Sequence, residues 1–191
     1  MANQSSTAFG FRPLRKVGQT DNNAGLGEWQ KGSGSAAIYH NELCNLETTG
    51  VVLSSTISTS TNVGVLNGSF YTDPTTSKPT WSNYAPNVAA SDHVCLLNDD
   101  PQQMFEAMTL RTDYVDPGTS VGACVPIVVG TGSTTTPFSS QNALGAIATD
   151  NQIKILGLTR DTLSQDVSVA GSVWRVMINE HILGNNVTGV A

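Results

Sequence analysis

From residue 36 onwards, short apolar runs alternate with clusters of Gly, Asn, Asp and Pro, and this pattern limits the possible folds most strongly. Short runs bounded by turn residues are typical of β-strands. Ser and Thr make up about a fifth of the chain, and charged residues only 13%, which is about half the usual share. Such a composition favours strands over helices. We expect an all-β protein whose β-barrel or β-sandwich (tulip-like) body has long loops and an extended N-terminal arm.

Residues 1–35 differ from the rest of the chain because they are rich in Gly and Asn, and Trp29 is the only aromatic side chain in their second half. Such a segment cannot bury enough surface to fold alone, although it can be ordered by lying across something else. We therefore expect an extended arm over 1–35 and a β-rich body over 36–191, with a weak subdivision near residue 90.

Turn residues divide the body into predicted strands. The Thr48–Gly50 turn predicts a hairpin that joins residues 43–46 to 51–53, and Gly64 and Gly68 predict bends or bulges within 62–72. Residues 101–110 are ambiguous, because Met104, Phe105 and Met108 have helical spacing. A strand is favoured there after the Asp-Asp-Pro turn. Further expectations are a long loop over 75–90, strands at 94–97, 152–158 and 172–179, and a short helix or turn at 139–147.

Charge and cysteine content exclude several classes of protein. The net charge is -6, and the nine Lys and Arg residues are spread along the chain, whereas nucleic-acid binding needs a clustered basic surface. No apolar run approaches the ~20 residues that a membrane span requires, and the N-terminus lacks a secretory signal. The cysteines are Cys44, Cys95 and Cys124. Their wide spacing favours free buried thiols in a reducing cytoplasm over disulfides or a zinc site.

No group of residues forms a convincing catalytic or metal site. Each histidine (His40, His93 and His181) has an acidic neighbour, but none has the spacing of metal ligands. The acidic residues Asp92, Asp99 and Asp100 lie at turns, and calcium is the less favoured interpretation because no EF-hand spacing is present. The Gly-rich stretch 129–136 lacks the Gly-Lys-Ser/Thr of a phosphate-binding loop. We therefore expect no enzyme, no cofactor and no metal.

A series of phrases in consistent order resembles a family of small virion proteins of tailed bacteriophages, the capsid decoration (cement) and minor structural proteins. These phrases are AFGFRPLR at 8–15, IYHNELCNLETTG at 38–50, GVLNGSFYTD at 64–73, WSNYAP at 81–86, NDDPQQMFEA at 98–107, GTGSTTT at 130–136, ILGL at 155–158 and VMINEHIL at 176–183. The chain departs from the family at 137–139, where Pro-Phe-Ser stands in place of Gly-Arg-Ser.

The resemblance implies a protein that is made in the host cytoplasm and binds the outside of the virion capsid. Its expected partner is the major capsid protein, and its expected state is a homotrimer, with no nucleic acid and no membrane. The N-terminal arm is then a candidate latch. Its apolar anchors would be Phe9, Phe11, Pro13 and Leu14, while Arg12 and Arg15 would pair with capsid carboxylates. The alternative for this arm is a solvated tail.

Two other functions fit the composition. A tail or adsorption-apparatus subunit has the same low-charge, Thr/Gly-rich β character. A carbohydrate-binding module would need exposed aromatic side chains, and the candidates are Trp29, Tyr71, Trp81, Tyr84 and Tyr114.

Overall fold

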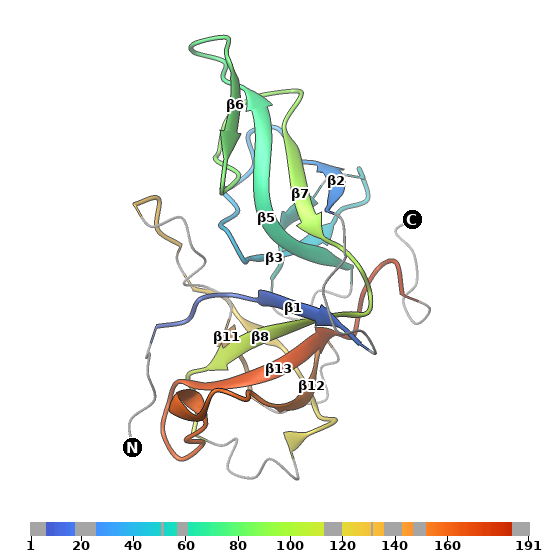
Figure 1. The fold of residues 1–191 in the computed structure, drawn as a ribbon. Coiled ribbons are helices and arrows are strands. Elements are labelled where there is room, and N and C mark those ends of the chain that lie inside the picture. Colours follow the sequence, from blue (N-terminus) through green and yellow to red (C-terminus); the bar gives the residue numbers. More distant parts are fainter. Residues whose placement is uncertain are drawn as a thin grey trace.

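The structure, a computed structural model, describes residues 7–17, 26–50, 52–56, 61–112, 120–130, 132–135, 143–146 and 152–184. These residues form thirteen strands and one short 3₁₀ helix, η1 (Thr162–Ser164). The strands build two sheets, which lie one above the other in Figure 1. The expectation of an all-β body is confirmed.

The lower sheet, here called the curled sheet, has seven strands. They are β1 (Arg12–Lys16), β8 (Gln103–Thr109), β9 (Cys124–Val125), β10 (Ile127–Val128), β11 (Ala143–Leu144), β12 (Ile153–Leu158) and β13 (Ser172–Ile178). The order β10-β11-β8-β13-β12-β9 places β9 and β10 at opposite ends, while β1 pairs with β8. Since only Pro126 separates β9 from β10 in the chain, the sheet has to curl round on itself (Figure 1).

The upper sheet, here called the hairpin sheet, has six strands in the order β2-β7-β5-β3-β4, with β6 paired to β5. They are β2 (Gly27–Gln30), β3 (Leu43–Leu46), β4 (Val52–Ser54), β5 (Asn62–Thr72), β6 (Pro79–Ser82) and β7 (Val94–Asn98). The predicted irregularities in β5 are confirmed, because its register shifts between Leu66 and Gly68 against β7 and beside Gly64 against β3.

Most predicted strands are present. The hairpin over 43–53 is β3 and β4, and residues 94–97 lie in β7. The ambiguous stretch 101–110 contains strand β8, in which six of the seven residues are buried. Along β13 the predicted alternation holds, because Trp174, Val176 and Ile178 all join the core.

Two local predictions are wrong. The expected loop over 75–90 contains strand β6, which pairs with the end of β5; Pro79 opens this strand, where its missing N–H costs little. The expected helix or turn over 139–147 contains strand β11, which joins β10 to β8. Residues 139–142 and 147 lie outside the described part. In both cases the strand pairs with residues outside the stretch. The partner of β6 is β5, and the partners of β11 are β10 and β8. The local pattern therefore did not reveal these two strands.

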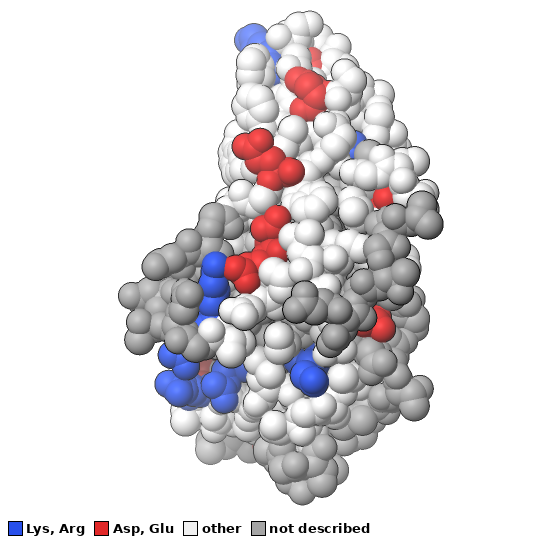
Figure 2. All heavy atoms as spheres, turned by 90° about the vertical axis from the view of Figure 1, so that its right-hand side faces the viewer, with Lys and Arg blue, Asp and Glu red and all other residues white. Residues whose placement is uncertain are grey.

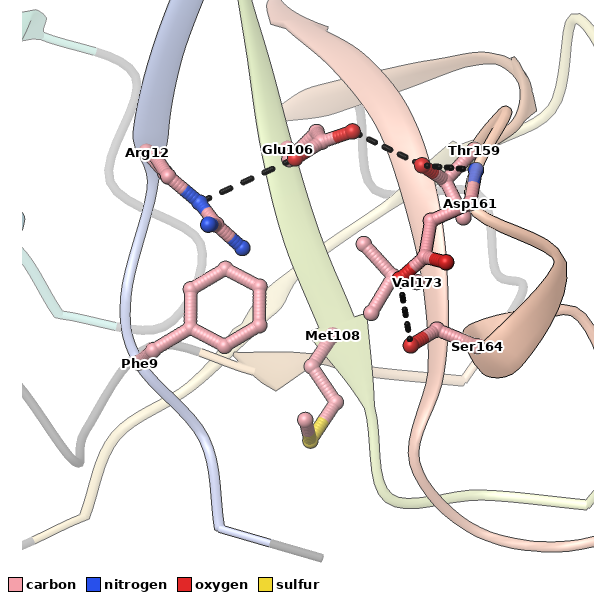
Figure 3. Close-up of a pocket in the computed structure, with 8 residues that line it drawn as sticks. All are labelled: Phe9, Arg12, Glu106, Met108, Thr159, Asp161, Ser164 and Val173. Carbon is pink, nitrogen blue, oxygen red and sulfur yellow. Dashed lines mark hydrogen bonds and ion pairs between the residues drawn. The ribbon is translucent and has the colours of Figure 1, made fainter. Parts of the chain in front are cut away.

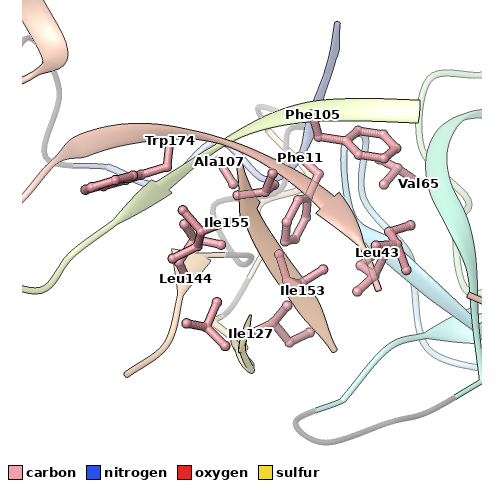
Figure 4. Packing of buried hydrophobic residues seen from close by; sticks show 13 residues of the cluster. Phe11, Leu43, Val65, Phe105, Ala107, Ile127, Leu144, Ile153, Ile155 and Trp174 are labelled. Carbon is pink, nitrogen blue, oxygen red and sulfur yellow. The ribbon is translucent and has the colours of Figure 1, made fainter. Parts of the chain in front are cut away.

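Both sheets contribute to the main core. Leu43 of β3 and Val65 of β5 belong to the same buried cluster as Phe105, Ile153 and Trp174 of the curled sheet, as Figure 4 shows. A second cluster around Cys95 and Leu97 lies within the hairpin sheet. The chain passes from one sheet to the other between β7 and β8, not near residue 90.

The described parts of residues 1–35 are strands of the body. Strand β1 pairs antiparallel with β8 of the curled sheet, and β2 pairs antiparallel with β7 of the hairpin sheet. The composition of this segment predicted an arm, because local sequence cannot reveal strand partners that lie more than sixty residues away in the chain. Within the described residues, there is therefore no boundary at residue 35 between a separate arm and the β-rich body.

Candidate docking surfaces

The N-terminal phrase Phe9-Gly10-Phe11 fastens the segment before β1 to the body. Phe11 is completely buried, and its ring meets that of Phe105 edge to face at 6.3 Å between centroids. Its N–H donates to the carbonyl oxygen of Asn41 at 2.8 Å. Gly10 has a φ of +77°, and a Cβ added there would lie 2.3 Å from that same carbonyl oxygen. Only glycine fits this close approach, which turns Phe11 inward and leaves Phe9 half-buried at the surface.

Phe9 and the following Arg12 form one wall of a small cavity. The cavity has a volume of about 170 Å³ and is lined by Phe9, Arg12, Glu106, Met108, Thr159, Asp161, Ser164 and Val173. Figure 3 shows Arg12 and Phe9 on one side, and Asp161 and Ser164 of the η1 region on the other. The guanidinium carbon of Arg12 lies 4.7 Å from the centroid of the Phe9 ring. This distance is typical of a cation–π contact.

Hydrogen bonds and an ion pair hold the polar rim of this cavity. Arg12 Nε lies 3.7 Å from Glu106 Oε2, and Thr159 Oγ1 donates to Glu106 Oε1 at 2.7 Å. Asp161 caps η1 by accepting from Leu163 N at 3.1 Å. Because ligand pockets usually measure about 300–1,000 Å³, this cavity has room for one side chain of a partner and is too small for a typical cofactor.

The structure separates the predicted capsid-binding residues into three groups. Phe9 and the exposed Arg12 come together at the cavity, whereas Phe11 belongs to the core and is not available to a partner. Pro13, Leu14 and Arg15 are half-buried in β1. An N-terminal latch made of all six residues is therefore not what the described structure presents.

The other chemical candidates lie apart from one another. Within the described ranges, no group of three or more His, Cys, Asp and Glu residues could hold a metal ion. The three turn carboxylates have separate partners: Asp92 accepts from Thr72 N, Asp99 from Trp29 Nε1, and Asp100 pairs with Lys16. Cys44 and Cys95 are buried free thiols, as predicted, and Cys124 is a half-buried one.

Three ionisable side chains are buried inside the hairpin sheet, which the sequence did not indicate. Lys31, Glu42 and His93 are at most 1% exposed. The Lys31 ammonium donates to Ser35 Oγ at 2.7 Å, and burial lowers its pKa. Burial raises the pKa of Glu42 to about 7, although its carboxylate accepts from Tyr39 N and Ser54 Oγ.

Burial also lowers the pKa of two histidines, His93 in the hairpin sheet and His181, to about 4. Among the described residues, neither ring nitrogen of His93 has a hydrogen-bond partner. His40 differs, because its Nδ1 lies 2.7 Å from the carbonyl oxygen of Asn67. The surroundings of all three histidines are therefore those of structural residues, and the three side chains do not form a common site.

Most of the aromatic residues proposed for carbohydrate binding are not free at the surface. Trp29 and Tyr84 are half-buried, and Tyr84 stacks on Tyr39 at 6.0 Å between centroids. Tyr71 is buried, and Tyr114 lies outside the described residues. Of the four that the structure describes, only Trp81 is well exposed, at 54%.

Sequence reasoning missed Phe70, which lies directly across from Trp81 and is 45% exposed. The signal for it was the alternation within 62–72, where Tyr71 faces inward and its neighbour must therefore face outward.

Comparison with known protein families, with curated proteins and with solved structures finds no match for this chain. Among the described residues, no helix is long and apolar enough to cross a membrane.

Proposed function

We propose that this chain is a non-enzymatic capsid decoration (cement) protein that binds the outside of a tailed-phage head and bridges major capsid protein subunits, as a homotrimer. The order of phrases that resembles the decoration proteins is the starting point. The single structural observation that supports the proposal best concerns the first of these phrases, AFGFRPLR. It is fastened to the body through Gly10 and Phe11, and it presents Phe9 and Arg12 beside a cavity of about 170 Å³.

A preformed docking site suits a protein that covers a seam. A flexible arm would have to be ordered on binding, and this ordering costs free energy. Here Phe9 and Arg12 are already positioned by the ring contact and by the ion pair to Glu106. Aromatic and arginine side chains are also the residue types that contribute most to protein–protein affinity. The cavity then accepts one apolar side chain of the shell, and Arg12, whose side chain is 57% exposed, pairs with a shell carboxylate.

The location is tested by cryo-electron microscopy of particles assembled with and without this chain. We expect additional density at the local three-fold positions of the outer shell, which disappears when the chain is omitted. Density confined to the tail or portal would contradict the proposal and support the tail or adsorption-apparatus subunit.

The docking residues are tested by titrating undecorated heads with purified variants. Deleting residues 1–16 is a poor test because it removes Phe11 from the core. The changes Phe9→Ala and Arg12→Ala are expected to weaken binding at least about tenfold, as for interface residues that contribute more than 1 kcal/mol. Lys78→Ala is the control, because Lys78 is exposed in the turn before β6. Unchanged binding of both variants would overturn this assignment of the docking residues.

A further inference from the structure

The outer face of the hairpin sheet carries an apolar patch. In one cross-strand row, Trp81 of β6 lies opposite Phe70 of β5, which in turn lies opposite Val94 of β7. Leu96, two residues further along β7, lies opposite Gly68 on the same face. Trp81 is 54% exposed and Phe70 is 45% exposed. Exposed apolar patches of this kind mark interaction sites.

The indole of Trp81 is held in place by the strand beneath it. A Cβ added at Gly68 would lie 2.6 Å from Cζ2 and 2.7 Å from Cη2 of Trp81. The six-membered ring therefore rests against the backbone of β5, where only a glycine leaves room for it. An aromatic ring positioned in advance loses little conformational freedom when a partner covers it.

Charge is distributed very unevenly over the chain. Residues 18–100, the range that contains all six strands of the hairpin sheet, have eight Asp or Glu and two Lys or Arg, whereas the rest of the chain has seven of each. The net charge of -6 therefore belongs entirely to this one region. Figure 2 shows Asp and Glu following one another down one side of the molecule, with Lys and Arg gathered below them. On the apolar face itself, Glu28 of β2 is exposed and lies opposite Leu96.

The outer face of the curled sheet has the opposite character. Arg12 of β1, Glu106 of β8 and Arg175 of β13 form one cross-strand row. In the neighbouring row, Met104 lies opposite Met177, which lies opposite Lys154 of β12. The single carboxylate in these two rows, that of Glu106, is already paired with Arg12. Met104 is buried, so this face offers the half-buried Met177 together with an excess of positive charge.

We infer that the hairpin-sheet face around Trp81 and Glu28 docks onto the curled-sheet face around Lys154 and Met177 of a second copy of this chain. Pairing of two hairpin-sheet faces with each other is disfavoured at low salt, because like charges repel. The contact is therefore between unlike surfaces, and repetition of such a contact closes a ring when the rotation permits. The inference deepens the proposed function, in which copies of the chain stand side by side on a shell.

Sedimentation velocity of the purified chain, with no capsid present, tests this contact separately from the decoration role. At roughly 100 μM and low salt we expect a species larger than the monomer. It should weaken when the salt is raised to 1 M, where the Debye length falls to about 3 Å. Trp81→Ala is expected to weaken self-association at least about tenfold.

Charge reversal identifies the two partner faces. Glu28→Lys and Lys154→Glu are each expected to give monomers, whereas the double variant should regain self-association because its two faces are again opposite in sign. Glu47→Lys reverses an exposed acidic residue in the turn between β3 and β4, away from the proposed contact, and serves as the control. Circular dichroism confirms that each variant folds.

Three results would overturn the inference. The first is a wild-type chain that remains monomeric at roughly 100 μM. The second is self-association that neither Trp81→Ala nor the single reversals disturb, or that the double reversal fails to restore. The third is a monomer that binds soluble polysaccharides through Trp81, which would assign this face to a glycan.

Discussion

The two sheets of this protein bury different kinds of side chain. The core cluster centred on the curled sheet includes Phe11, Phe105 and Trp174, and the polar side chains buried in its strands, Gln103, Thr109 and Ser172, do not ionise. The interior of the hairpin sheet contains Lys31, Glu42 and His93, each almost completely buried. The sheet that buries ionisable groups also has the most exposed aromatic pair and accounts for the whole net charge.

This difference indicates that the two sheets have different main sources of stability. Apolar burial stabilises the curled sheet in a way that is independent of pH. The hairpin sheet contains groups whose protonation changes between the folded and unfolded chain, so its stability depends on pH. We therefore assign the scaffold role mainly to the curled sheet and expect variation in pH to act first on the hairpin sheet.

The largest effect is expected for Phe11→Ala, since the side chain is fully buried and packed against Phe105. Truncation of a buried phenylalanine costs about 3–5 kcal/mol. Phe70→Ala is the matched control in the hairpin sheet and should cost far less, because nearly half of Phe70 is exposed. Urea unfolding of both variants gives the comparison. Equal losses would mean that Phe11 is not part of the core.

Gly10→Ala is expected to be the next most disruptive change. Both Gly10 and Gly50 have a φ of +77°, but a Cβ would meet the Asn41 carbonyl at Gly10 and nothing within 4 Å at Gly50. The backbone conformation alone costs roughly 1–2 kcal/mol, and overpacking adds roughly 1–3 kcal/mol at Gly10. Thermal melts of Gly10→Ala and Gly50→Ala separate the two contributions. A loss no larger at Gly10 would contradict the close contact.

Glu42→Gln is expected to remove part of the pH dependence. The pKa of Glu42 is raised from 4.5 to about 7, so between these pH values the folded chain retains a proton that the unfolded chain has lost. The stability contributed by Glu42 therefore falls as the pH rises from 4.5 to 7 and is level above that range. This shift in the pKa of Glu42 corresponds to a change of roughly 3 kcal/mol in the free energy of unfolding.

The Gln side chain does not titrate, so the stability of Glu42→Gln relative to wild type should grow by up to roughly 3 kcal/mol between pH 4.5 and 8. His93 and His181 titrate with the opposite sign, because their folded pKa values are lowered to about 4. They are present in both proteins and cancel in the difference. Denaturant unfolding of wild type and Glu42→Gln at the two pH values measures this difference in stability. A difference that does not change with pH would refute the assignment of this pH dependence to Glu42.

The smallest effect on folding is expected for Trp81→Ala, which removes an exposed side chain. Its free energy of unfolding should fall by about 1 kcal/mol, because part of the indole packs against β5, while self-association weakens at least about tenfold. Leu163→Ala, at an exposed position in η1 beside the curled sheet, should leave both properties unchanged. A large loss of stability in Trp81→Ala would show that the indole has a structural role.

Local information in the sequence was sufficient for many of the strands, but not for β1, β2, β6 or β11. Turn residues and alternating apolar positions predicted β3, β4, β5, β7, β12 and β13 and the irregularities at Gly64 and Gly68, because strand periodicity and turn conformation depend on neighbouring residues. The same information predicted an all-β chain. It also drew attention to the phrase AFGFRPLR, of which Phe9 and Arg12 line the cavity.

Only the tertiary structure decided which residues are covered. The N-terminal segment reads as an arm by composition, yet Phe11 is buried because Phe105 and Asn41, remote in the chain, surround it. Lys31, Glu42 and His93 look like surface residues in the sequence and become buried where the hairpin sheet folds over them. Burial and strand partners depend on contacts between distant parts of the chain. Local pattern therefore determined where many of the strands lie, and long-range packing determined the remaining strands and which faces remain open to a partner.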